Sequence, residues 1–401
     1  MAVRSRRLGR ILEVGLGWIL YGGRPTPAEP FDPDRVRRIL VVRNDNLGDL
    51  LCTTPGLRAL RRRFSSAHIA VLVPEHCRAV LRGNPDIDEV LSYTKAKHQR
   101  HGTTVGAWWR MLRLFRAVWS RHFDLAIAMR QRFSQSAAWL VYASRAPWRL
   151  GNRPPAEEPL GFFLNVGQRQ PGAHEAQHEV DAVLEILRPL GVTPVPRELI
   201  LSVDPVACER VARRLAEQGI GPEARVALVH ISNRRRTSRW PLDRFAAVAE
   251  ALAERYGFRI LVNWAPGDAS NPLYPGDDAL ATQVLDKLRV PVEAWETSSL
   301  ETFIASIHRS QFVFSTDGGA MHFAAAFHVP QVVIFGRTPL DGWRPCSPVA
   351  RVLKRGEEAG NITVEEALAA IHSLSSELGW QTAETPVATE PGLDAAERRG
   401  P

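Results

Sequence analysis

Three polar loops of this 401-residue sequence contain residue types that can do chemistry. Each loop follows an apolar run that is typical of a buried strand and precedes an apolar helical period. At such strand-to-helix turns, side chains and backbone N–H groups face a ligand together, and the helix dipole favours negative charge. We therefore expect acid–base chemistry and anion binding from the loops at residues 44–49, 230–241 and 315–322.

The first loop ends in Gly48 and Asp49. An aspartate at this position can act as a general base that takes a proton from a substrate hydroxyl. The glycine before it permits close approach of another group. The alternative is that Asp49 only caps the following helix, because Asp is common at helix N-termini.

The third loop contains Asp317 followed by Gly318 and Gly319. The two glycines leave backbone N–H groups accessible, so this turn could hold a diphosphate. His322, one turn into the helix, could contact phosphate or sugar. The alternatives are a tight turn that requires glycine and a histidine with a structural role.

The second loop contains Ser232, Asn233 and four arginines, at positions 234–236 and 239. Arginines bind phosphate through charge-assisted hydrogen bonds, although a solvated run of charge is the alternative. Asp268 follows the next apolar run, where a carboxylate could accept hydrogen bonds from ribose or sugar hydroxyls.

Motifs of several other classes are missing from the sequence. It contains no HExxH motif and no cluster of His and Cys at metal-ligand spacing, and its four cysteines are scattered, so we expect no metal. It contains neither GxxxxGK[ST] nor a GxGxxG after the first strand, which argues against ATP hydrolysis and NAD-linked redox chemistry. No cofactor is expected.

The elements that position the loops form two α/β units of similar size. Buried strands that alternate with helices indicate doubly wound parallel sheets, and ligands bind at the carboxyl ends of such strands. We therefore expect a site in the cleft between the units. The predicted strands are 39–42, 68–74, 89–93, 124–129, 224–232, 258–264, 311–317 and 331–336. The predicted helices are one between the turn at 44–49 and residue 64, followed by 76–83, 103–121, 136–144, 178–192, 242–257, 278–288, 299–309 and 318–328, with an irregular loop at 151–175.

Positive charge is concentrated in the first part of the chain. Residues 1–150 contain 26 Lys and Arg against 11 Asp and Glu, whereas residues 151–401 contain 25 against 32. The basic part should attract a polyanion, such as nucleic acid, anionic lipid or phosphorylated glycan. No helix-turn-helix or RNP-like motif supports nucleic acid, so none is expected as a partner.

Two segments have the composition of a membrane-surface helix. One is the basic, amphipathic start of the chain, and the other is the tryptophan- and arginine-rich stretch at 108–114. The alternative for both is packing on their own domain. No apolar run approaches the ~20 residues of a spanning helix.

Taken together, the motifs resemble those of the ADP-heptose:lipopolysaccharide heptosyltransferases, the inverting glycosyltransferase family nine. The resemblance covers about residues 37–345 and rests on residues 46–49, 54–60, 178–191 and 315–330. It implies the GT-B architecture, in which two Rossmann-like domains face a central cleft, and metal-independent transfer. The boundaries expected on this basis are 1–36 for a basic N-terminal extension, 37–195 for an acceptor domain, 196–376 for a nucleotide-sugar domain and 377–401 for a mobile tail.

The resemblance also implies roles for individual residues. It makes Asp49 the base that deprotonates the acceptor hydroxyl. It assigns the nucleotide sugar to Ser232, Asn233, Asp268, Asp317, Gly318, Gly319 and His322. It assigns the acceptor to Asn46, Lys95, Lys97, Arg100 and Gln131.

One position departs from the family pattern. Many relatives have Lys two residues before the Trp of the Trp240-Pro241 pair, where this chain has Ser238. Arg236 or Arg239 could supply the missing charge, with a planar fork in place of a point charge.

The expected partners are ADP-heptose as donor, an anionic Kdo- or heptose-bearing glycolipid as acceptor, and the inner leaflet of the inner membrane, on the cytoplasmic side. The alternatives are a family relative that glycosylates a protein or a capsule, and a noncatalytic protein that binds sugar nucleotides. All of these hypotheses that involve catalysis require Asp49 to lie close to the loop at 315–322.

Overall fold

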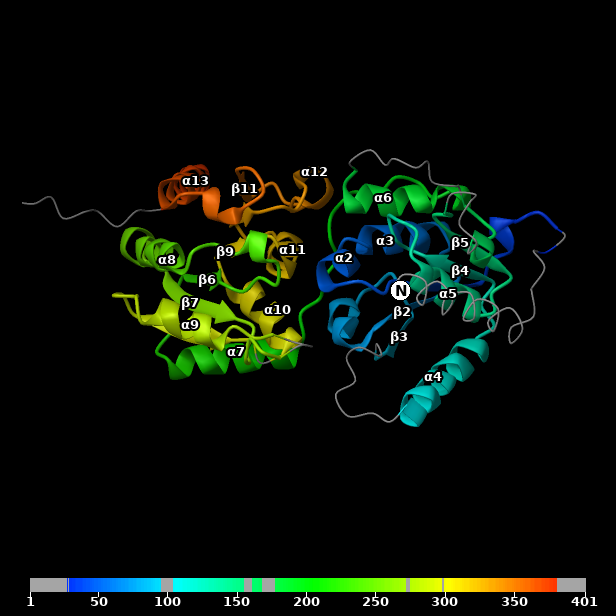
Figure 1. The fold of residues 1–401 in the computed structure, drawn as a ribbon. Helices are drawn as coiled ribbons and strands as arrows, with labels where there is room; N and C mark the ends of the chain where they lie inside the picture. The colour runs from blue at the N-terminus through cyan, green and yellow to red at the C-terminus, as the bar shows by residue number, and fades with distance from the viewer. Residues whose placement is uncertain are drawn as a thin grey trace, which may run out of the picture.

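Two parallel sheets form the framework of the computed structural model, which describes residues 27, 29–94, 104–154, 161–167, 177–271, 275–297 and 299–380. The N-terminal sheet has the strand order β3-β2-β1-β4-β5, and the C-terminal sheet has the order β11-β10-β9-β6-β7-β8. Figure 1 shows the two halves side by side, with the helices α2 and α11 at their boundary. The predicted architecture of two doubly wound α/β domains is confirmed.

In the N-terminal half, strands and helices alternate as the apolar pattern predicts. Its strands are β1 (Arg38–Val42), β2 (His68–Pro74), β3 (Glu89–Tyr93), β4 (Leu125–Ala128) and β5 (Trp148–Gly151). Its α-helices are α2 (Leu47–Leu51), α3 (Thr54–Arg63), α4 (Thr104–Trp119), α5 (Gln135–Ala143) and α6 (Glu179–Ile186). Its 3₁₀ helices are η1 (Pro33–Arg35), η2 (Glu75–Leu81), η4 (Gly161–Phe163) and η5 (Arg188–Leu190).

The C-terminal half follows after a connection without regular structure. Its strands are β6 (Val226–His230), β7 (Arg259–Trp264), β8 (Val292–Glu296), β9 (Phe312–Thr316), β10 (Gln331–Phe335) and β11 (Ala350–Lys354). Its α-helices are α7 (Pro205–Glu217), α8 (Leu242–Tyr256), α9 (Asp278–Leu285), α10 (Leu300–Arg309), α11 (Gly319–Ala326), α12 (Leu340–Trp343) and α13 (Val364–Glu377), with 3₁₀ helices η6 (Arg236–Ser238) and η7 (Ala359–Asn361).

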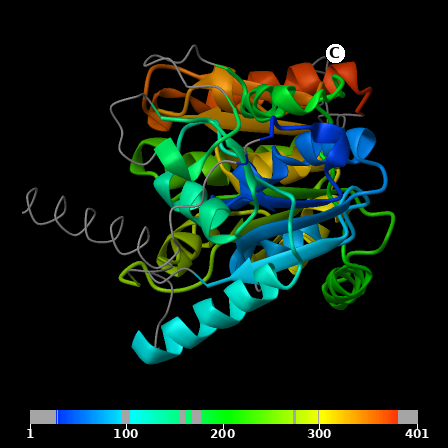
Figure 2. The same ribbon diagram turned by 90° about the vertical axis from the view of Figure 1, so that its right-hand side faces the viewer.

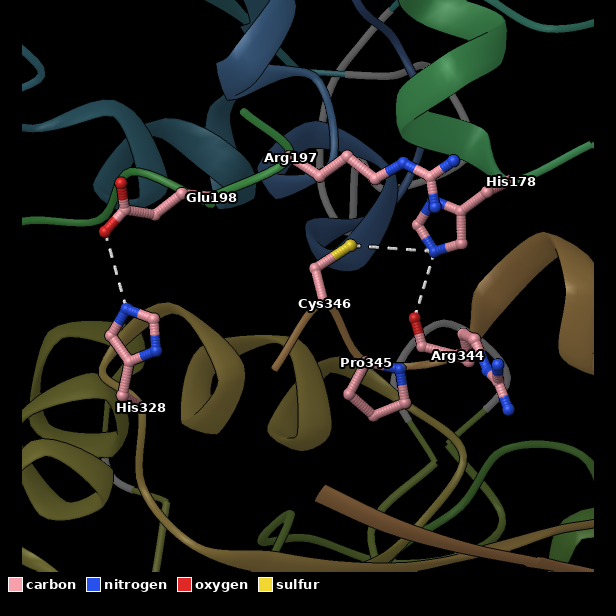
Figure 3. A pocket seen from close by; sticks show the side chains of 7 residues that line it. All are labelled: His178, Arg197, Glu198, His328, Arg344, Pro345 and Cys346. Carbon is pink, nitrogen blue, oxygen red and sulfur yellow. Dashed lines mark hydrogen bonds and ion pairs between the residues drawn. The ribbon is translucent and has the colours of Figure 1, made fainter. Parts of the chain in front are cut away.

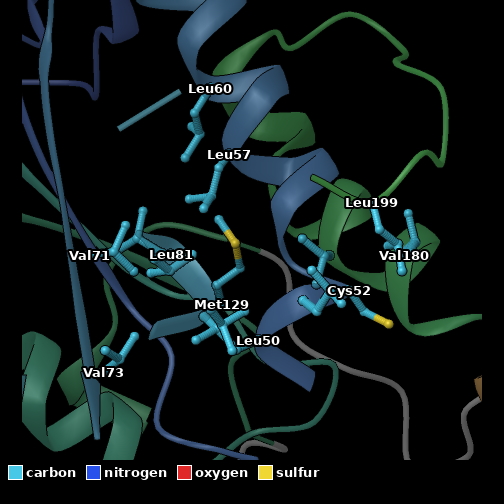
Figure 4. Close-up of a cluster of buried hydrophobic side chains, with 14 of the residues drawn as sticks. Leu50, Cys52, Leu57, Leu60, Val71, Val73, Leu81, Met129, Val180 and Leu199 are labelled. Carbon is cyan, nitrogen blue, oxygen red and sulfur yellow. The ribbon is translucent and has the colours of Figure 1, made fainter. Parts of the chain in front are cut away.

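Both faces of the N-terminal sheet are buried, which explains the continuous apolar run of β1. Ile39 and Val41 pack on one face, and Leu40 and Val42 on the other. Figure 4 shows part of the first cluster, where leucines of α2 and α3 meet side chains of the sheet. This cluster continues into the C-terminal half through residues such as Phe323, so apolar packing joins the two halves.

Several elements differ from the sequence-based expectation. The predicted helix at 76–83 is the 3₁₀ helix η2, and the predicted irregular loop at 151–175 begins with the last residue of β5. The helices α7 and α13 and the strands β5, β8 and β11 were not anticipated. β8 and β11 lie at sheet edges and are mostly half-exposed, so they lack the apolar run of a central strand.

The two chain ends lie largely outside the described residues, which leaves most of the expected N-terminal extension and tail without a structural account. Within the expected tail, Glu377 still belongs to α13, and the Trp380 ring packs against Tyr256 and Phe258. No helix of the described chain is long and apolar enough to cross a membrane.

Gly336, directly after β10, packs against η6 in the loop that contains the arginines, and a substitution there tests this contact. A Cβ at Gly336 would lie 2.1 Å from the carbonyl oxygen of Thr237 in η6, which is too close for the backbone to accommodate. We expect Gly336→Ala to lower the free energy of unfolding by about 1–3 kcal/mol, measured by urea denaturation. The control is Gly360→Ala, because a Cβ there meets nothing within 4 Å. Equal stability of the two variants would contradict this account.

Candidate active site

The first and third loops meet across the boundary between the halves. A Cβ at Gly48 would lie only 2.7 Å from Cδ2 of His322, so the glycine backbone of α2 rests directly against the α11 histidine. A Cβ at Gly319 would lie 3.9 Å from the Leu47 Cβ. The polar ends of β1 and β9 therefore share one site, as the doubly wound topology predicts.

Asp49 lies in the first turn of α2 and is partly exposed, with 20% of its side chain accessible. Its Oδ2 accepts a hydrogen bond of 3.3 Å from the Asn46 N–H, and its Oδ1 lies 3.5 Å from Nη2 of Arg43. The helix-capping alternative is thus correct in part. Capping and accessibility coexist here, so Asp49 can still meet a substrate.

The buried Arg43 forms ion pairs with three carboxylates next to the site. Its guanidinium donates a 2.7 Å hydrogen bond to Glu179, lies 3.2 Å from Asp45, and also contacts Asp49. Burial opposes the charge of Arg43, but the three carboxylates outweigh it and raise the pKa of the guanidinium. Burial raises the pKa of Glu179, although Arg43 opposes this shift. Arg43 thereby holds in place the loop that carries Asp49.

Asn233, which follows the neighbouring strand β6, forms hydrogen bonds to the third loop. Its Nδ2 donates to the Thr316 hydroxyl at 2.9 Å and to the Asp317 carbonyl at 2.7 Å. The Asp317 carboxylate is 6% exposed and accepts a hydrogen bond from the Thr338 hydroxyl. Asn233 and Asp317 therefore hold the turn that presents Gly318, which is the N-cap of α11.

His322 is almost completely buried between the halves. Burial, with help from the nearby His178, lowers its pKa to about 4, and Asp49 only partly opposes this shift. Its Nδ1 lies 3.7 Å from the Cys52 sulfur. At neutral pH the ring is uncharged, so it can act as a hydrogen-bonding group but not as a cation toward phosphate.

The arginine loop approaches the same turn. Arg235 donates a 2.7 Å hydrogen bond to the Thr338 hydroxyl, which is the group that also contacts Asp317. Arg239 donates to the Asn233 carbonyl at 2.9 Å. Arg236 is exposed, whereas Ser238 is fully buried. Arg235 belongs to the four arginines expected to bind phosphate, although only Arg236 and Arg239 were expected to replace the missing lysine, and its guanidinium reaches the α11 turn through Thr338.

The other candidates for donor binding, Ser232 and Asp268, follow the carboxyl ends of β6 and β7. Ser232 accepts a 2.9 Å hydrogen bond from the Ala265 N–H, which fixes the loop after β7. Asp268 is exposed, and hydrogen bonds from Ser270 lower the pKa of its carboxyl. The carboxyl thus lies at the surface after β7, where the sequence placed it.

The acceptor candidates are only partly described. Asn46 is exposed at the N-cap of α2, beside Asp49. Gln131 follows β4, and its Nε2 donates a 3.1 Å hydrogen bond to the Gln177 carbonyl. Lys95, Lys97 and Arg100 lie outside the described residues. Within the described ranges, no group of three or more His, Cys, Asp or Glu could hold a metal ion.

A hollow between the halves lies beside the linker that joins them. It has a volume of about 340 Å³ and is lined by residues that include His178, Arg197, Arg344 and Cys346 (Figure 3). The His178 Nδ1 accepts from the Val180 N–H at 3.2 Å, so Nε2 carries the proton and donates to the Arg344 carbonyl at 3.0 Å. This hydrogen bond ties α6 to the C-terminal half beside the site.

Sequence reasoning missed Arg43, Glu179 and Thr338 as parts of the site. Arg43 directly follows a buried strand, and this placement is the one local signal that it could be a buried charge. Nothing local indicates its pairing with Glu179, which is 136 residues away.

Comparison with known proteins gives a consistent result. The family model "Glycosyltransferase family 9 (heptosyltransferase)" matches residues 111–369. Lipopolysaccharide heptosyltransferase 3 of Escherichia coli is 24% identical over 306 residues, which are 75% of this chain and 84% of that protein.

Two solved structures have the same fold. A family 9 glycosyl transferase from Veillonella parvula superposes with a TM-score of 0.72 and 21% identity, covering 85% of this chain and 97% of the other. The E. coli ADP-heptose lipopolysaccharide heptosyltransferase II gives a TM-score of 0.66 and 20% identity, covering 85% and 99%. With the family model matched over more than half of its length, this chain belongs to glycosyltransferase family 9, the heptosyltransferases, and is a glycosyltransferase of the GT-B fold.

Proposed function

We propose that this protein transfers a heptosyl group from ADP-heptose to the inner core of lipopolysaccharide, with inversion at the anomeric carbon. The observation that carries the proposal is the contact between the Asp49 loop and the α11 turn, which joins a base to an anion-binding turn. The names of the similar proteins, a lipopolysaccharide heptosyltransferase and an ADP-heptose enzyme, support this choice of donor and acceptor.

The proposed reaction is a single displacement. Asp49 takes the proton of the acceptor hydroxyl as that oxygen forms a bond to the anomeric carbon of the heptose. The bond between this carbon and the diphosphate oxygen breaks, and ADP leaves with the electron pair. Attack from the face opposite the leaving group inverts the anomeric configuration.

Charge on the leaving diphosphate is stabilised by the N–H groups at the start of α11 and by arginine. We assign a cation for the diphosphate to Arg235, because its guanidinium reaches Thr338 beside the α11 turn. Ser238 is buried and uncharged, so the position that holds Lys in relatives contributes no cation here. Neutral His322 would supply a hydrogen bond to the donor.

The proposed acceptor is an anionic Kdo- or heptose-bearing lipid, and it fits the excess of positive charge in residues 1–150. Such a lipid would bring the enzyme to the inner face of the inner membrane. Asn46 and Gln131 lie on the side of the site that belongs to this half, and Asn46 directly flanks the Asp49 helix.

Asp49→Asn tests the base. We expect kcat to fall by about 10²–10⁴ with the fold unchanged, because the amide keeps the shape of the side chain but cannot take the proton. Release of ADP from ADP-heptose in the presence of a Kdo-lipid acceptor measures the rate. Asp243→Asn, an exposed change on α8, is the matched control. Near-normal turnover of Asp49→Asn would remove this residue from the mechanism, and absence of turnover in the unaltered enzyme would favour a noncatalytic protein.

Arg235→Gln tests the cation. Loss of a charge-assisted contact to diphosphate should weaken donor binding by roughly 10- to 100-fold, seen as a higher KM for ADP-heptose or a higher Kd for ADP. The neighbouring exposed Arg234→Gln serves as the control and should change these constants little. Similar effects of the two substitutions would mean that only general positive charge matters.

The lowered pKa of His322 predicts how the free energy of unfolding depends on pH. The unfolded chain binds a proton at this residue below about pH 6.5, whereas the folded chain does so only near pH 4. Protonation of His322 in the unfolded chain should therefore cost up to roughly 3 kcal/mol of unfolding free energy as the pH falls through this window, and this contribution of His322 should level off below pH 4. Urea denaturation of His322→Gln should show a smaller loss, whereas His372→Gln, an exposed control, should behave like the unaltered protein. An unchanged pH profile in His322→Gln would contradict the burial effect.

A further inference from the structure

The helix α4 has two faces of different character. Its inner face contains Phe115 and Val118, which are buried, and the Phe115 ring meets Trp139 of α5 edge-on at 5.4 Å. The Trp119 indole N–H donates a 2.8 Å hydrogen bond to the Ala143 carbonyl. These contacts attach the C-terminal part of α4 firmly to the N-terminal half.

The outer face presents large apolar side chains to solvent. Trp109 is 60% exposed and Leu112 is 44% exposed, which excludes the alternative that this tryptophan belongs to the core. Arg113 and Arg116 are also exposed and lie on the same side of the helix, since positions 109, 112, 113 and 116 repeat at helical spacing. We call these four residues the outer face of α4.

Charge on this face has one sign. No Asp or Glu occurs between residues 104 and 119, and Arg113 and Arg116 form no ion pair with any described residue. The exposed Trp109 and Leu112, together with Arg113 and Arg116 on the same face, combine two requirements of binding at a lipid interface. The apolar side chains can enter the headgroup layer while the guanidinium groups meet anionic lipids.

The place of α4 in the fold leaves this face accessible. Figures 1 and 2 show the helix at the periphery of the N-terminal half, away from the C-terminal half and from the boundary between them. A planar partner could therefore contact α4 without covering the site at Asp49 and α11. A nucleic acid would pair with the arginines but would gain little from an aliphatic Leu112, so charge and apolar surface together favour a bilayer.

We infer that the outer face of α4 is the surface by which this enzyme rests on an anionic bilayer. The inference rests on the proposed function, because a lipid-linked acceptor is what would require such docking. Residues 95–100, expected to bind the acceptor, directly precede α4 in the sequence.

The test is cosedimentation of the full chain with vesicles of phosphatidylcholine, with and without about 30% phosphatidylglycerol. The unaltered protein should bind the anionic vesicles, and binding should weaken with added salt. Trp109→Ser with Leu112→Ser should lower the partition coefficient about tenfold or more. Arg113→Gln with Arg116→Gln should lower it roughly fivefold per arginine on anionic vesicles, because each basic residue contributes about 1 kcal/mol there.

Matched controls come from α7 in the other half. Val206 is 60% exposed, and Arg210 and Arg213 are exposed with the same spacing as the α4 pair. Val206→Ser and the double variant Arg210→Gln with Arg213→Gln should bind vesicles like the unaltered protein. Equal losses in the α4 and α7 variants would show that net charge and hydrophobicity matter rather than this face, and would overturn the inference.

Transfer to a deacylated, water-soluble acceptor separates this inference from the proposed function. The α4 variants should retain their rate with the soluble acceptor and lose rate only with acceptor embedded in vesicles. Vesicle binding that is unaffected by the α4 changes would overturn the docking surface even if transfer is normal. Failure of the unaltered enzyme to use either acceptor, with α4-dependent vesicle binding intact, would instead refute the acceptor proposed above.

Discussion

The buried guanidinium of Arg43 is the interaction on which the site depends. A charge in this position must be compensated, and removing one partner of a buried pair typically costs several kcal/mol. Glu179 and Asp45 provide that compensation, and Asp49 lies at the edge of the same group. The end of β1, the start of α6 and the first turn of α2 are thus held in one arrangement by a single side chain.

This arrangement acts together with close packing between the halves. At Gly48 there is no room for a side chain, because His322 occupies the space that a Cβ would need. The hydrogen bond from His178 to the Arg344 carbonyl ties the residue before Glu179 to the C-terminal half. Arg43 therefore positions Asp49 within its own domain, and the contacts of Gly48 and His178 position that domain against the α11 turn.

The sequence predicted the central strands and the edge strand β3, and it missed the edge strands β5, β8 and β11. Strands such as β1 and β6 are buried on both faces, so their apolar runs are unambiguous. The edge strands β8 and β11 carry charged residues and half-exposed side chains, and no such run identifies them. The meeting of the loops at Asp49 and His322 followed from the topology. The Arg43 pairs could not be predicted, because their partners converge only once the chain has folded.

The distribution of charge shows why local geometry must decide where anions bind. Residues 151–401 carry an excess of acidic side chains, yet the turn proposed to bind the diphosphate lies among them. Exposed charges more than about 8–10 Å apart are largely screened at physiological salt, so distant acids matter little at the α11 turn. In the proposed reaction, Arg235 and the N–H groups of α11 would meet the diphosphate at contact distance, where screening is weak. In the basic half, by contrast, arginines such as those on the outer face of α4 are spread over the surface. Charge that is spread over a surface suits an extended polyanionic partner. A single turn with one or two arginines suits a small leaving group. The N-terminal half has the first arrangement of charge and the C-terminal half has the second.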